Sequence, residues 1–398
     1  MQQLVITRLD GRIVSTVFKE NELLQISVEP QDVTLLGNIY VGKVKNIVKN
    51  INAAFVEIEG GQMCYLSLNE KSTPVFLKPK ANEKICIGDE LLVQISKDAI
   101  KTKNPSVTAK LQLAGKYMVL THGDTRISVS SKITDENVRK DLITFVKEEV
   151  GKNRSFGIII RTNAKDADVD VLRLELKAMV EDYNNIIQQG IHKTCFSKIY
   201  EAPAGYLCDI RDGYDANIES ILTDERDIYE AIKNYLSKTQ PSDLAKLQFH
   251  EKENCTLSML YGIETKLKKA LQEKVWLQSG GYLVIQPTEA LTVIDVNTGK
   301  AVSGKKDVEK HFLKINCEAA KEIAKQLRLR NLSGIIVVDF IDMKEKSAKE
   351  ILISTLCTEL KKDSIKTAFV DMTKLNLVEI TRKKVRKPLH EQWQKREG

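Results

Sequence analysis

The sequence has 398 residues, 42% of them hydrophobic and 29% charged, with 20 Gly and 8 Pro, which indicates a globular chain of two to four domains without a long low-complexity tract. The net charge of +7 favours a polyanionic partner, and seven scattered cysteines without a Cys-x-x-Cys pair favour a reducing, cytoplasmic location. No segment has the apolar length of a signal peptide or a membrane span, so we expect no membrane partner.

The first part of the chain reads as short strands. Within residues 1–35, Asp10-Gly11 separates two β-like runs, which is a hairpin signal. From 36 to 110, strands are predicted at 38–48, 53–60, 64–68 and 89–98, separated by Gly and Asn turns. Such a series is typical of a small antiparallel barrel.

Residues 135–275 mix helices and strands. Helical periodicity in 136–150 and 171–190 flanks a strand at 155–162. Further along we expect a strand at 205–211 and helices at 225–236 and 256–271.

The last third alternates strands and helices. Two strands in 282–299 precede a long amphipathic helix at 307–330, for which Asn331 and Gly334 provide the stop. A buried strand at 334–343, a helix at 347–363 and a strand region at 367–381 follow. This order predicts an α/β layer whose apolar strands are covered on both faces.

The end of the chain is basic. Residues 380–398 hold seven Lys/Arg against two Glu. Such a segment is a solvated end or a nucleic-acid arm, and the pattern alone leaves both open.

Two aspartates form the sharpest constellation. Asp295 and Asp339 each follow an apolar strand run, and one helix joins the two runs, so adjacent parallel strands are expected. Carboxylates at the carboxyl ends of such strands suit Mg²⁺ together with a substrate phosphate. Asn297 would share their side and donate a hydrogen bond to a phosphate oxygen. The alternative is that these side chains cap helices or pin turns, and for Glu289 and Asp342 nearby we favour that structural role.

A phosphate-binding loop is a rival interpretation of the same region. Residues 299–306 follow a strand and precede a helix, and Asp339 would then end the metal-binding strand of a nucleotide hydrolase. However, Lys306 stands where a Ser or Thr should hold Mg²⁺, and Asp295 has no role in that scheme.

The predicted barrel presents aromatic side chains to solvent. Alternation puts Phe55 on the polar face of 53–60, and Tyr65 on the outer face of 64–68. Two such rings on neighbouring strands are a stacking platform for single-stranded RNA, with Lys97 and Lys103 as phosphate contacts. Ordinary cross-strand packing is the alternative.

With these features in place, residues 4–386 resemble the catalytic half of the ribonuclease E/G family. The matching stretches are EALTVIDVNTG, AAKEIAKQLRLRNLSGIIVVDFIDM, NIYVGKVKNI with AAFV, LAGKYMVL and IIIRT. The resemblance implies a multidomain α/β and β architecture. Its expected parts are a ribonuclease H-like fold (1–35 and 201–270), an inserted OB-type RNA-binding barrel (36–110), a 5′-phosphate sensor (111–200), a deoxyribonuclease I-like catalytic region (271–386) and a basic tail (387–398).

The resemblance also implies roles for particular residues. Asp295 and Asp339 correspond to the Mg²⁺ ligands and Asn297 to the residue that orients the scissile phosphate. The barrel's RNA contacts would be Phe55, Tyr65 (often Phe in the family) and Lys103, and the pocket for a 5′-monophosphate would be Gly115, Val119, Arg161 and Thr162.

The implied activity is metal-assisted endonucleolytic hydrolysis of single-stranded RNA in RNA processing and decay, leaving 5′-phosphate and 3′-hydroxyl ends. The family's zinc link uses a Cys-x-x-Cys pair, which this sequence lacks, so a homo-oligomer is compatible with the resemblance but a zinc-linked tetramer is not expected. The alternative functions are the nucleotide hydrolase above and an RNA-binding adaptor without catalysis, against which the complete Asp295, Asn297 and Asp339 set argues.

Overall fold

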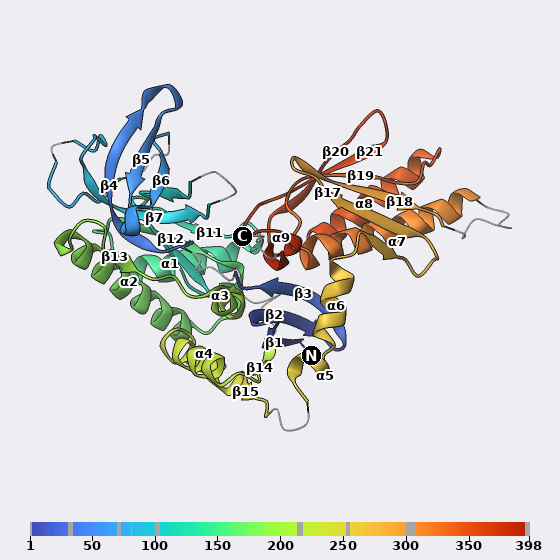
Figure 1. The fold of residues 1–398 in the computed structure, drawn as a ribbon, viewed down its shortest axis with the longest axis horizontal. Coiled ribbons are helices and arrows are strands. Elements are labelled where there is room, and N and C mark those ends of the chain that lie inside the picture. Colours follow the sequence, from blue (N-terminus) through green and yellow to red (C-terminus); the bar gives the residue numbers. More distant parts are fainter. Residues whose placement is uncertain are drawn as a thin grey trace. The chain divides into compact units, whose positions relative to one another are not determined.

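The structure is a computed structural model that describes residues 2–30, 35–69, 73–80, 82–99, 104–212, 218–251, 255–299 and 308–394. It divides into two units, each assembled from segments that are distant in sequence (Figure 1). Unit 1 comprises 1–31, 213–233 and 243–398, and unit 2 comprises 32–212 and 234–242. None of the helices in the described ranges has both the length and the apolar character needed to cross a membrane.

The N-terminal strands of unit 1 form a five-stranded sheet. The predicted hairpin is confirmed, because Leu9 lies opposite Arg12, and Asp10 and Gly11 adopt φ values of 49° and 74° in the turn between them. β14 joins the other side of β1 in parallel, although more than 200 residues separate them. The sheet has the order β15-β14-β1-β2-β3, with β1 (Gln2–Leu9), β2 (Arg12–Lys19), β3 (Glu22–Val28), β14 (Ile218–Thr223) and β15 (Leu247–Phe249).

Several helices follow the strands of this sheet along the chain, and those within 257–270 and 389–393 pack against it. The helix predicted over 256–271 is in fact two helices, because Gly262 takes a left-handed φ of 58° between them. The basic end is also partly packed: the Trp393 ring lies under the Arg12 guanidinium at 5.0 Å, and Leu389 is fully buried. These elements are α4 (Arg226–Thr239), η4 (Pro241–Lys246), α5 (Leu257–Leu260), α6 (Ile263–Ala270) and α9 (Leu389–Trp393).

The second sheet of unit 1 has six strands in the order β16-β17-β18-β19-β21-β20. β18 and β19 are parallel neighbours, joined by the long helix α7, as predicted. Asn331, with φ of 49°, and Gly334, with φ of 91°, terminate that helix segment. The elements are β16 (Lys274–Trp276), β17 (Tyr282–Pro287), β18 (Leu291–Asn297), α7 (Val308–Leu329), β19 (Gly334–Asp339), α8 (Lys346–Leu360), β20 (Thr367–Met372) and β21 (Leu377–Arg382).

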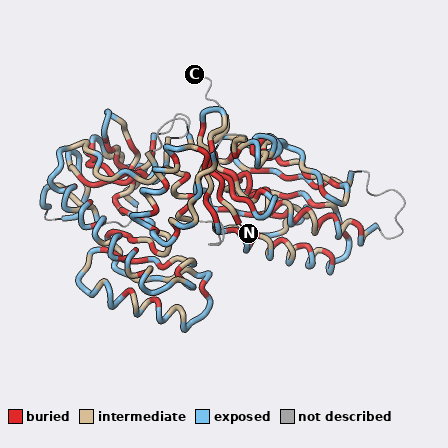
Figure 2. Tube along the Cα trace, turned by 90° about the horizontal axis from the view of Figure 1, so that it is seen from below, coloured by how far each residue is buried: buried red, intermediate tan, exposed pale blue. Residues whose placement is uncertain are grey.

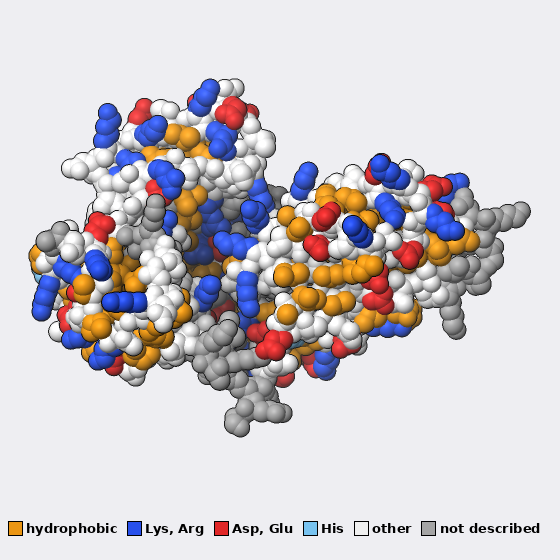
Figure 3. Space-filling model, turned by 90° about the horizontal axis from the view of Figure 1, so that it is seen from above, with side chains coloured by type: hydrophobic (Ala, Val, Ile, Leu, Met, Phe, Trp, Pro, Cys, Tyr) orange, Lys and Arg blue, Asp and Glu red, His pale blue; other side chains and the backbone are white. Residues whose placement is uncertain are grey.

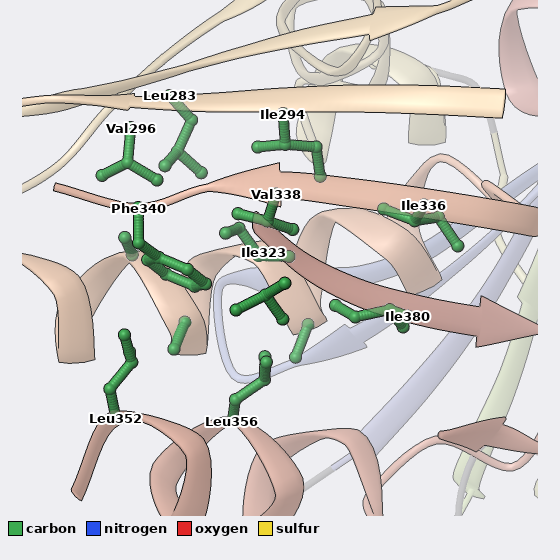
Figure 4. Close-up of a cluster of buried hydrophobic side chains, with 14 of the residues drawn as sticks. Leu283, Ile294, Val296, Ile323, Ile336, Val338, Phe340, Leu352, Leu356 and Ile380 are labelled. Carbon is green, nitrogen blue, oxygen red and sulfur yellow. The ribbon is translucent and has the colours of Figure 1, made fainter. Parts of the chain in front are cut away.

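Helices α7 and α8 cover only one face of this sheet. Ile294 and Val338 point from β18 and β19 toward Ile323 of α7 (Figure 4), and all three are fully buried. Figure 2 shows buried stretches along the strands and exposed residues along the outer turns of the helices. The expectation that both faces would be covered is wrong within unit 1, because β18 and β19 alternate between buried and half-exposed or exposed residues. On the open face Val293 is 37% and Ile335 57% exposed, and Figure 3 shows rows of hydrophobic side chains beside acidic ones on this part of the chain. The apolar runs alone did not reveal this two-residue period.

A closed five-stranded barrel, of the OB-like kind that was predicted, begins unit 2. Its strands follow the order β4-β5-β6-β8-β7, and β7 pairs back with β4, which closes the sheet on itself. Gly42 is required inside, because a Cβ there would lie 2.5 Å from the Val56 side chain. The elements are β4 (Ile39–Val48), η1 (Lys49–Ile51), β5 (Ala53–Glu57), η2 (Glu59–Gly61), β6 (Met63–Ser67), β7 (Glu90–Lys97), β8 (Ser106–Thr108) and, paired with β4, β13 (Lys198–Tyr200).

The rest of unit 2 is a four-stranded sheet, ordered β11-β12-β10-β9, packed against helices. The segment 205–211, predicted as a strand, is instead the helix α3. Its buried residues Tyr206, Asp209 and Ile210 have spacings of three and four, which is the period of a helix and not of a strand. The elements are β9 (Gln112–Ala114), β10 (Met118–His122), β11 (Ile127–Val129), α1 (Glu136–Val150), β12 (Phe156–Ile160), η3 (Thr162–Asp166), α2 (Val169–His192) and α3 (Gly205–Asp212).

Candidate functional site

The open face of the second sheet in unit 1 carries the predicted aspartates. Asp295 and Asp339 are direct partners in the parallel register of β18 and β19, so their side chains leave the same face of neighbouring strands. Both residues are exposed, whereas the flanking Ile294, Val296 and Val338 are buried against the helices. The predicted strand pairing is therefore confirmed, and it brings the two carboxylates together.

Asn297 lies two residues beyond Asp295 on the same face. Its side-chain Nδ2 donates a hydrogen bond of 2.7 Å to Oδ2 of Asp295. The amide therefore orients one carboxylate of the pair. Among the described residues no group of three or more His, Cys, Asp and Glu side chains suits a metal ion, so a cation here would have two protein carboxylates.

The carboxylate pair is electrostatically strained. Partial burial, followed by the negative charges of Asp295 and Asp342, raises the pKa of Asp339 above its ordinary value. The like charges nearby disfavour ionisation of Asp339, and a divalent cation between the two carboxylates would remove that penalty. Carboxylate oxygens with free coordination positions for water and phosphate are the ligands that suit Mg²⁺. The donor set therefore fits this ion.

The loop that follows Asp339 is held by side chains of α7. The fully buried Asn316 donates to the carbonyl of Ile341 at 2.8 Å and accepts from its N–H at 3.1 Å. Glu309 accepts the backbone N–H groups of Lys344 and Glu345 at 2.6 and 2.8 Å. These bonds fix the chain at the carboxyl end of β19, where Asp339 stands.

Other candidates from the sequence have different positions. Glu289 lies in the turn before β18, six residues from Asp295 and at the opposite end of that strand. Asp342 accepts a hydrogen bond of 3.1 Å from Asn376, in keeping with the structural role expected for it. The phosphate-loop candidate at 299–306 lies outside the described residues apart from Gly299.

The barrel of unit 2 arranges half-buried side chains and one exposed lysine in a row across its strands. Phe55 and Tyr65 are direct partners on β5 and β6, and their ring centroids are 6.3 Å apart in an edge-to-face arrangement. The row continues through Ser106 on β8 to Lys97 on β7. The predicted alternation of inward and outward side chains is confirmed, because the inward-facing residues of β5 and β6 are buried. These are Ala54 and Val56 on β5, and Cys64 and Leu66 on β6. Lys103 lies outside the described residues.

Unit 2 also brings together the residues assigned to a phosphate pocket. Arg161, just after β12, donates from Nη1 to the carbonyl of Gly115 at 2.7 Å and to Asp212 at 2.8 Å. Thr162 follows it and shares a hydrogen bond of 3.0 Å with a Ser130 hydroxyl. Val119 lies on the adjacent strand β10 and is half-buried.

Asp212 is a partner that the sequence did not reveal. Its carboxylate accepts from Arg161 and, at 3.1 and 3.0 Å, from Arg211. Burial opposes its ionisation, but the bonds and charges of Arg211 and Arg161 prevail and lower the pKa of Asp212. Among the described residues, the side-chain hydrogen bonds of Arg161 are all made by Nη1.

Glu175 was also missed, although the sequence carried a signal for it. It lies on the buried stripe of α2, beside Leu172 and Leu176, where a charged side chain is unusual. Its carboxylate accepts the N–H groups of residues 116, 117 and 118 at 2.8 to 2.9 Å, which fixes the turn after Gly115. A Cβ on Gly115 would meet this carboxylate at 2.6 Å, so a larger residue there would displace the Glu175 side chain from these hydrogen bonds.

Comparisons with known proteins match nearly the whole chain. The model of the ribonuclease E/G family matches residues 112–385. Ribonuclease G of Haemophilus influenzae is 32% identical over 368 residues, which is 89% of this chain and 74% of that protein. Ribonuclease G of Escherichia coli is 31% identical over 391 residues, covering 96% and 78%. Ribonuclease E of a Nostoc species is 30% identical over 384 residues, covering 95% of this chain and 55% of that protein.

Proposed function

This chain belongs to the ribonuclease E/G family, and from that premise we propose that Asp295 and Asp339 hold Mg²⁺ for the hydrolysis of single-stranded RNA. The chain is a hydrolase, an endoribonuclease that acts in RNA processing. The single observation that carries the metal assignment is the direct parallel pairing of the two aspartates on one open sheet face.

Each residue of the site has a distinct part. Asp295 and Asp339 would each contribute a carboxylate oxygen to the ion, and the raised pKa of Asp339 supports a cation between them. Bound there, Mg²⁺ would supply a Lewis acid and lower the pKa of a water. Asn297, which donates to Asp295, would orient a phosphate oxygen of the scissile bond through its amide. Attack by water, and not by the ribose 2′-hydroxyl, would leave 5′-phosphate and 3′-hydroxyl ends.

The test is cleavage of a short fluorescent single-stranded RNA with and without Mg²⁺. We expect internal cuts only with the ion, and products whose 5′ ends a phosphatase dephosphorylates. ATP hydrolysis, measured in parallel, should remain at background. Cuts that persist in a chelator, or products with 2′,3′-cyclic phosphate ends, would overturn the proposed chemistry.

The barrel row would bind the substrate strand. Phe55 and Tyr65 would stack on bases, while Lys97 contacts phosphate, because base–aromatic stacking tolerates any sequence. Phe55→Ala and Tyr65→Ala should each weaken RNA binding by about 1–3 kcal/mol. The loss of stability should stay below the roughly 3–5 kcal/mol of a buried aromatic truncation. Unchanged RNA affinity with a large loss of stability would mean that the rings only support the fold.

The Arg161 pocket would sense the 5′ end of the RNA. Its guanidinium edge, the Thr162 hydroxyl and the backbone at Gly115 and Val119 are within one small region of unit 2. A 5′-monophosphate offers the oxygens that such a fork binds, whereas a 5′-hydroxyl offers none. RNA with a 5′-monophosphate should therefore be cut faster.

The wider architecture remains part of the proposal. The segments 1–35 and 201–270 contribute strands to one sheet, β15-β14-β1-β2-β3, which supports a ribonuclease H-like part with 36–110 and 111–200 inserted as barrel and sensor. The sheet with α7 and α8 supports a deoxyribonuclease I-like region at 271–386, followed by the tail 387–398. All seven cysteines are free thiols, which supports a cytoplasmic location. Sedimentation would decide whether the chain forms a homo-oligomer.

A further inference from the structure

An aromatic pair, an exposed tryptophan and a half-buried tyrosine, lies on the same open face as the carboxylates. Trp276, on the edge strand β16, is 65% exposed, and its direct strand partner is Tyr282 on β17. The two ring centroids are 5.3 Å apart, with the planes tilted by 59°. Cross-strand packing explains why the rings touch, but it does not explain why an indole stays mostly in water, since a large apolar side chain is normally buried.

The strand register connects this pair to the metal site. Tyr282 lies directly opposite Asn297, and Asn297 donates to Asp295. Neighbouring strands are about 4.8 Å apart, so Tyr282 is one strand and Trp276 two strands from the amide that would orient the scissile phosphate. The next residue, Leu283, is fully buried on the helix side, which fixes the Tyr282 ring on the open side.

A cation accompanies the rings. The Lys274 ammonium lies 4.1 Å from the centroid of Trp276 and 3.7 Å from that of Tyr282. Lys274 is exposed, and Trp276 keeps most of its surface although the ammonium and Tyr282 lie against it. An available indole face beside a positive charge matches a nucleotide, which combines a flat base with a negative phosphate.

We propose that Trp276, Tyr282 and Lys274 form a nucleotide-binding subsite in which a base of the substrate RNA stacks on Trp276 next to the bond that is cut. The inference rests on the proposed function of Asp295, Asn297 and Asp339. Its occupant is single-stranded RNA, because the subsite continues the row of Asn297 across two strands and carries a cation. The subsite would hold the strand in register on the catalytic sheet, independently of the barrel row of Phe55 and Tyr65.

The first experiment reports binding without catalysis. The chain has two tryptophans, so Trp393→Phe leaves Trp276 as the single indole. Titration of this variant with a short single-stranded RNA, in buffer that contains a chelator, should quench the Trp276 fluorescence. The midpoint of the quenching curve should equal the midpoint of binding measured by the anisotropy of a labelled RNA. RNA binding without any change in Trp276 fluorescence would overturn the subsite.

The second experiment reports the effect on cleavage. Stacking worth about 1–3 kcal/mol per base corresponds to a rise in KM of roughly fivefold to a hundredfold for Trp276→Ala, with kcat nearly unchanged. Trp276→Tyr should restore most of the affinity, because a ring remains. Leu375→Ala is the matched control, since Leu375 is 79% exposed in the turn between β20 and β21, at the other edge of this sheet from β16, and should have no effect.

RNAs with one abasic position then identify the stacked nucleotide. An abasic nucleotide at one position near the cut should raise the KM of the wild type. The same abasic RNA should cause no additional rise in KM for Trp276→Ala. If Trp276→Ala changes the mass in solution but not KM, the patch is a contact between copies of the chain, and the proposal is wrong. If the wild type quenches with RNA but never cuts it with Mg²⁺, the catalytic proposal fails while the binding subsite stands.

Discussion

The carboxylate pair on β18 and β19 brings like charges together, whereas the arginine pocket beside β10 and β12 brings opposite charges together. Asp295 and Asp339 face one another with like charge, and among the described residues neither has an ion-pair partner. In the pocket, Arg161 and Arg211 share the carboxylate of Asp212, so opposite charges are already paired there. Under the proposed function, the first site would take up a cation from solution, whereas the second would exchange part of an existing ion pair for its ligand.

The largest expected effect tests the carboxylate pair on β18 and β19. Asp295→Asn or Asp339→Asn should slow cleavage by roughly a hundredfold to a thousandfold, because charge stabilisation by a bound ion is worth several kcal/mol. The free energy of unfolding in a chelator should not fall, since the change relieves repulsion between two carboxylates. Initial rates and urea titrations measure the two quantities.

A matched variant controls this result. Asp371 is an exposed acid on β20 of the same sheet, so Asp371→Asn makes the same change in charge away from the pair. Its cleavage should stay within a few-fold of the wild type. Equal losses in Asp371→Asn and Asp339→Asn would show that only the general field of the sheet matters.

The second effect concerns the pocket. Arg161→Gln should abolish the faster cleavage of 5′-monophosphorylated RNA over 5′-hydroxyl RNA, a preference of roughly tenfold to a hundredfold if the charged hydrogen bonds contribute about 1.5–3 kcal/mol. Circular RNA should be cut at the wild-type rate. A variant that retains the preference would rule out Arg161 as a 5′ sensor.

The third effect separates the two sites by stability. Asp212→Asn removes the carboxylate that Arg161 and Arg211 share, so the free energy of unfolding should fall by about 1 kcal/mol, a value kept low because this side chain is 39% exposed. The 5′-monophosphate preference should persist or increase, since a competitor for Arg161 is gone. A loss of preference would instead mean that Asp212 positions the arginine.

The smallest effect tests whether unit 2 buries ionisable groups only when they are paired or neutral. The buried His122 ring contacts the Tyr183 hydroxyl at 2.6 Å and the Thr73 carbonyl at 2.9 Å, and burial lowers its pKa below the ordinary 6.5. The unfolded chain therefore takes up a proton at higher pH than the folded chain does. The neutral His122 ring therefore contributes fully to the free energy of unfolding above about pH 6.5. This contribution is lost as the pH falls through the lowered pKa of the folded chain.

The measurement is the melting temperature at a series of pH values between about 7 and 5. The wild type should lose more stability over this window than His122→Gln, which cannot take up the proton. Parallel curves for the two proteins would show that His122 titrates alike in the folded and unfolded chains.

Local patterns were sufficient for several elements. The Asp10-Gly11 turn, the alternation at Phe55 and Tyr65, and the strand–helix–strand order around Asp295 and Asp339 all follow from turn residues and hydrophobic period. The errors arose in short segments, where a few residues do not distinguish the helical from the strand period, or where a single glycine interrupts a helix. The segment 205–211 became a helix, and Gly262 divided one predicted helix into two.

By itself, the sequence singled out the residues that we propose for the chemistry, because the two aspartates each follow an apolar strand run: Asp295, Asn297 and Asp339 were identifiable as candidates without coordinates. Only the tertiary structure decided which groups surround them. The opposition of Tyr282 to Asn297, the shared use of Asp212 by two arginines and the Glu175 carboxylate beneath Gly115 each join residues from separate elements. Register across strands and packing between elements are long-range choices made by the whole core, and no local pattern contains them.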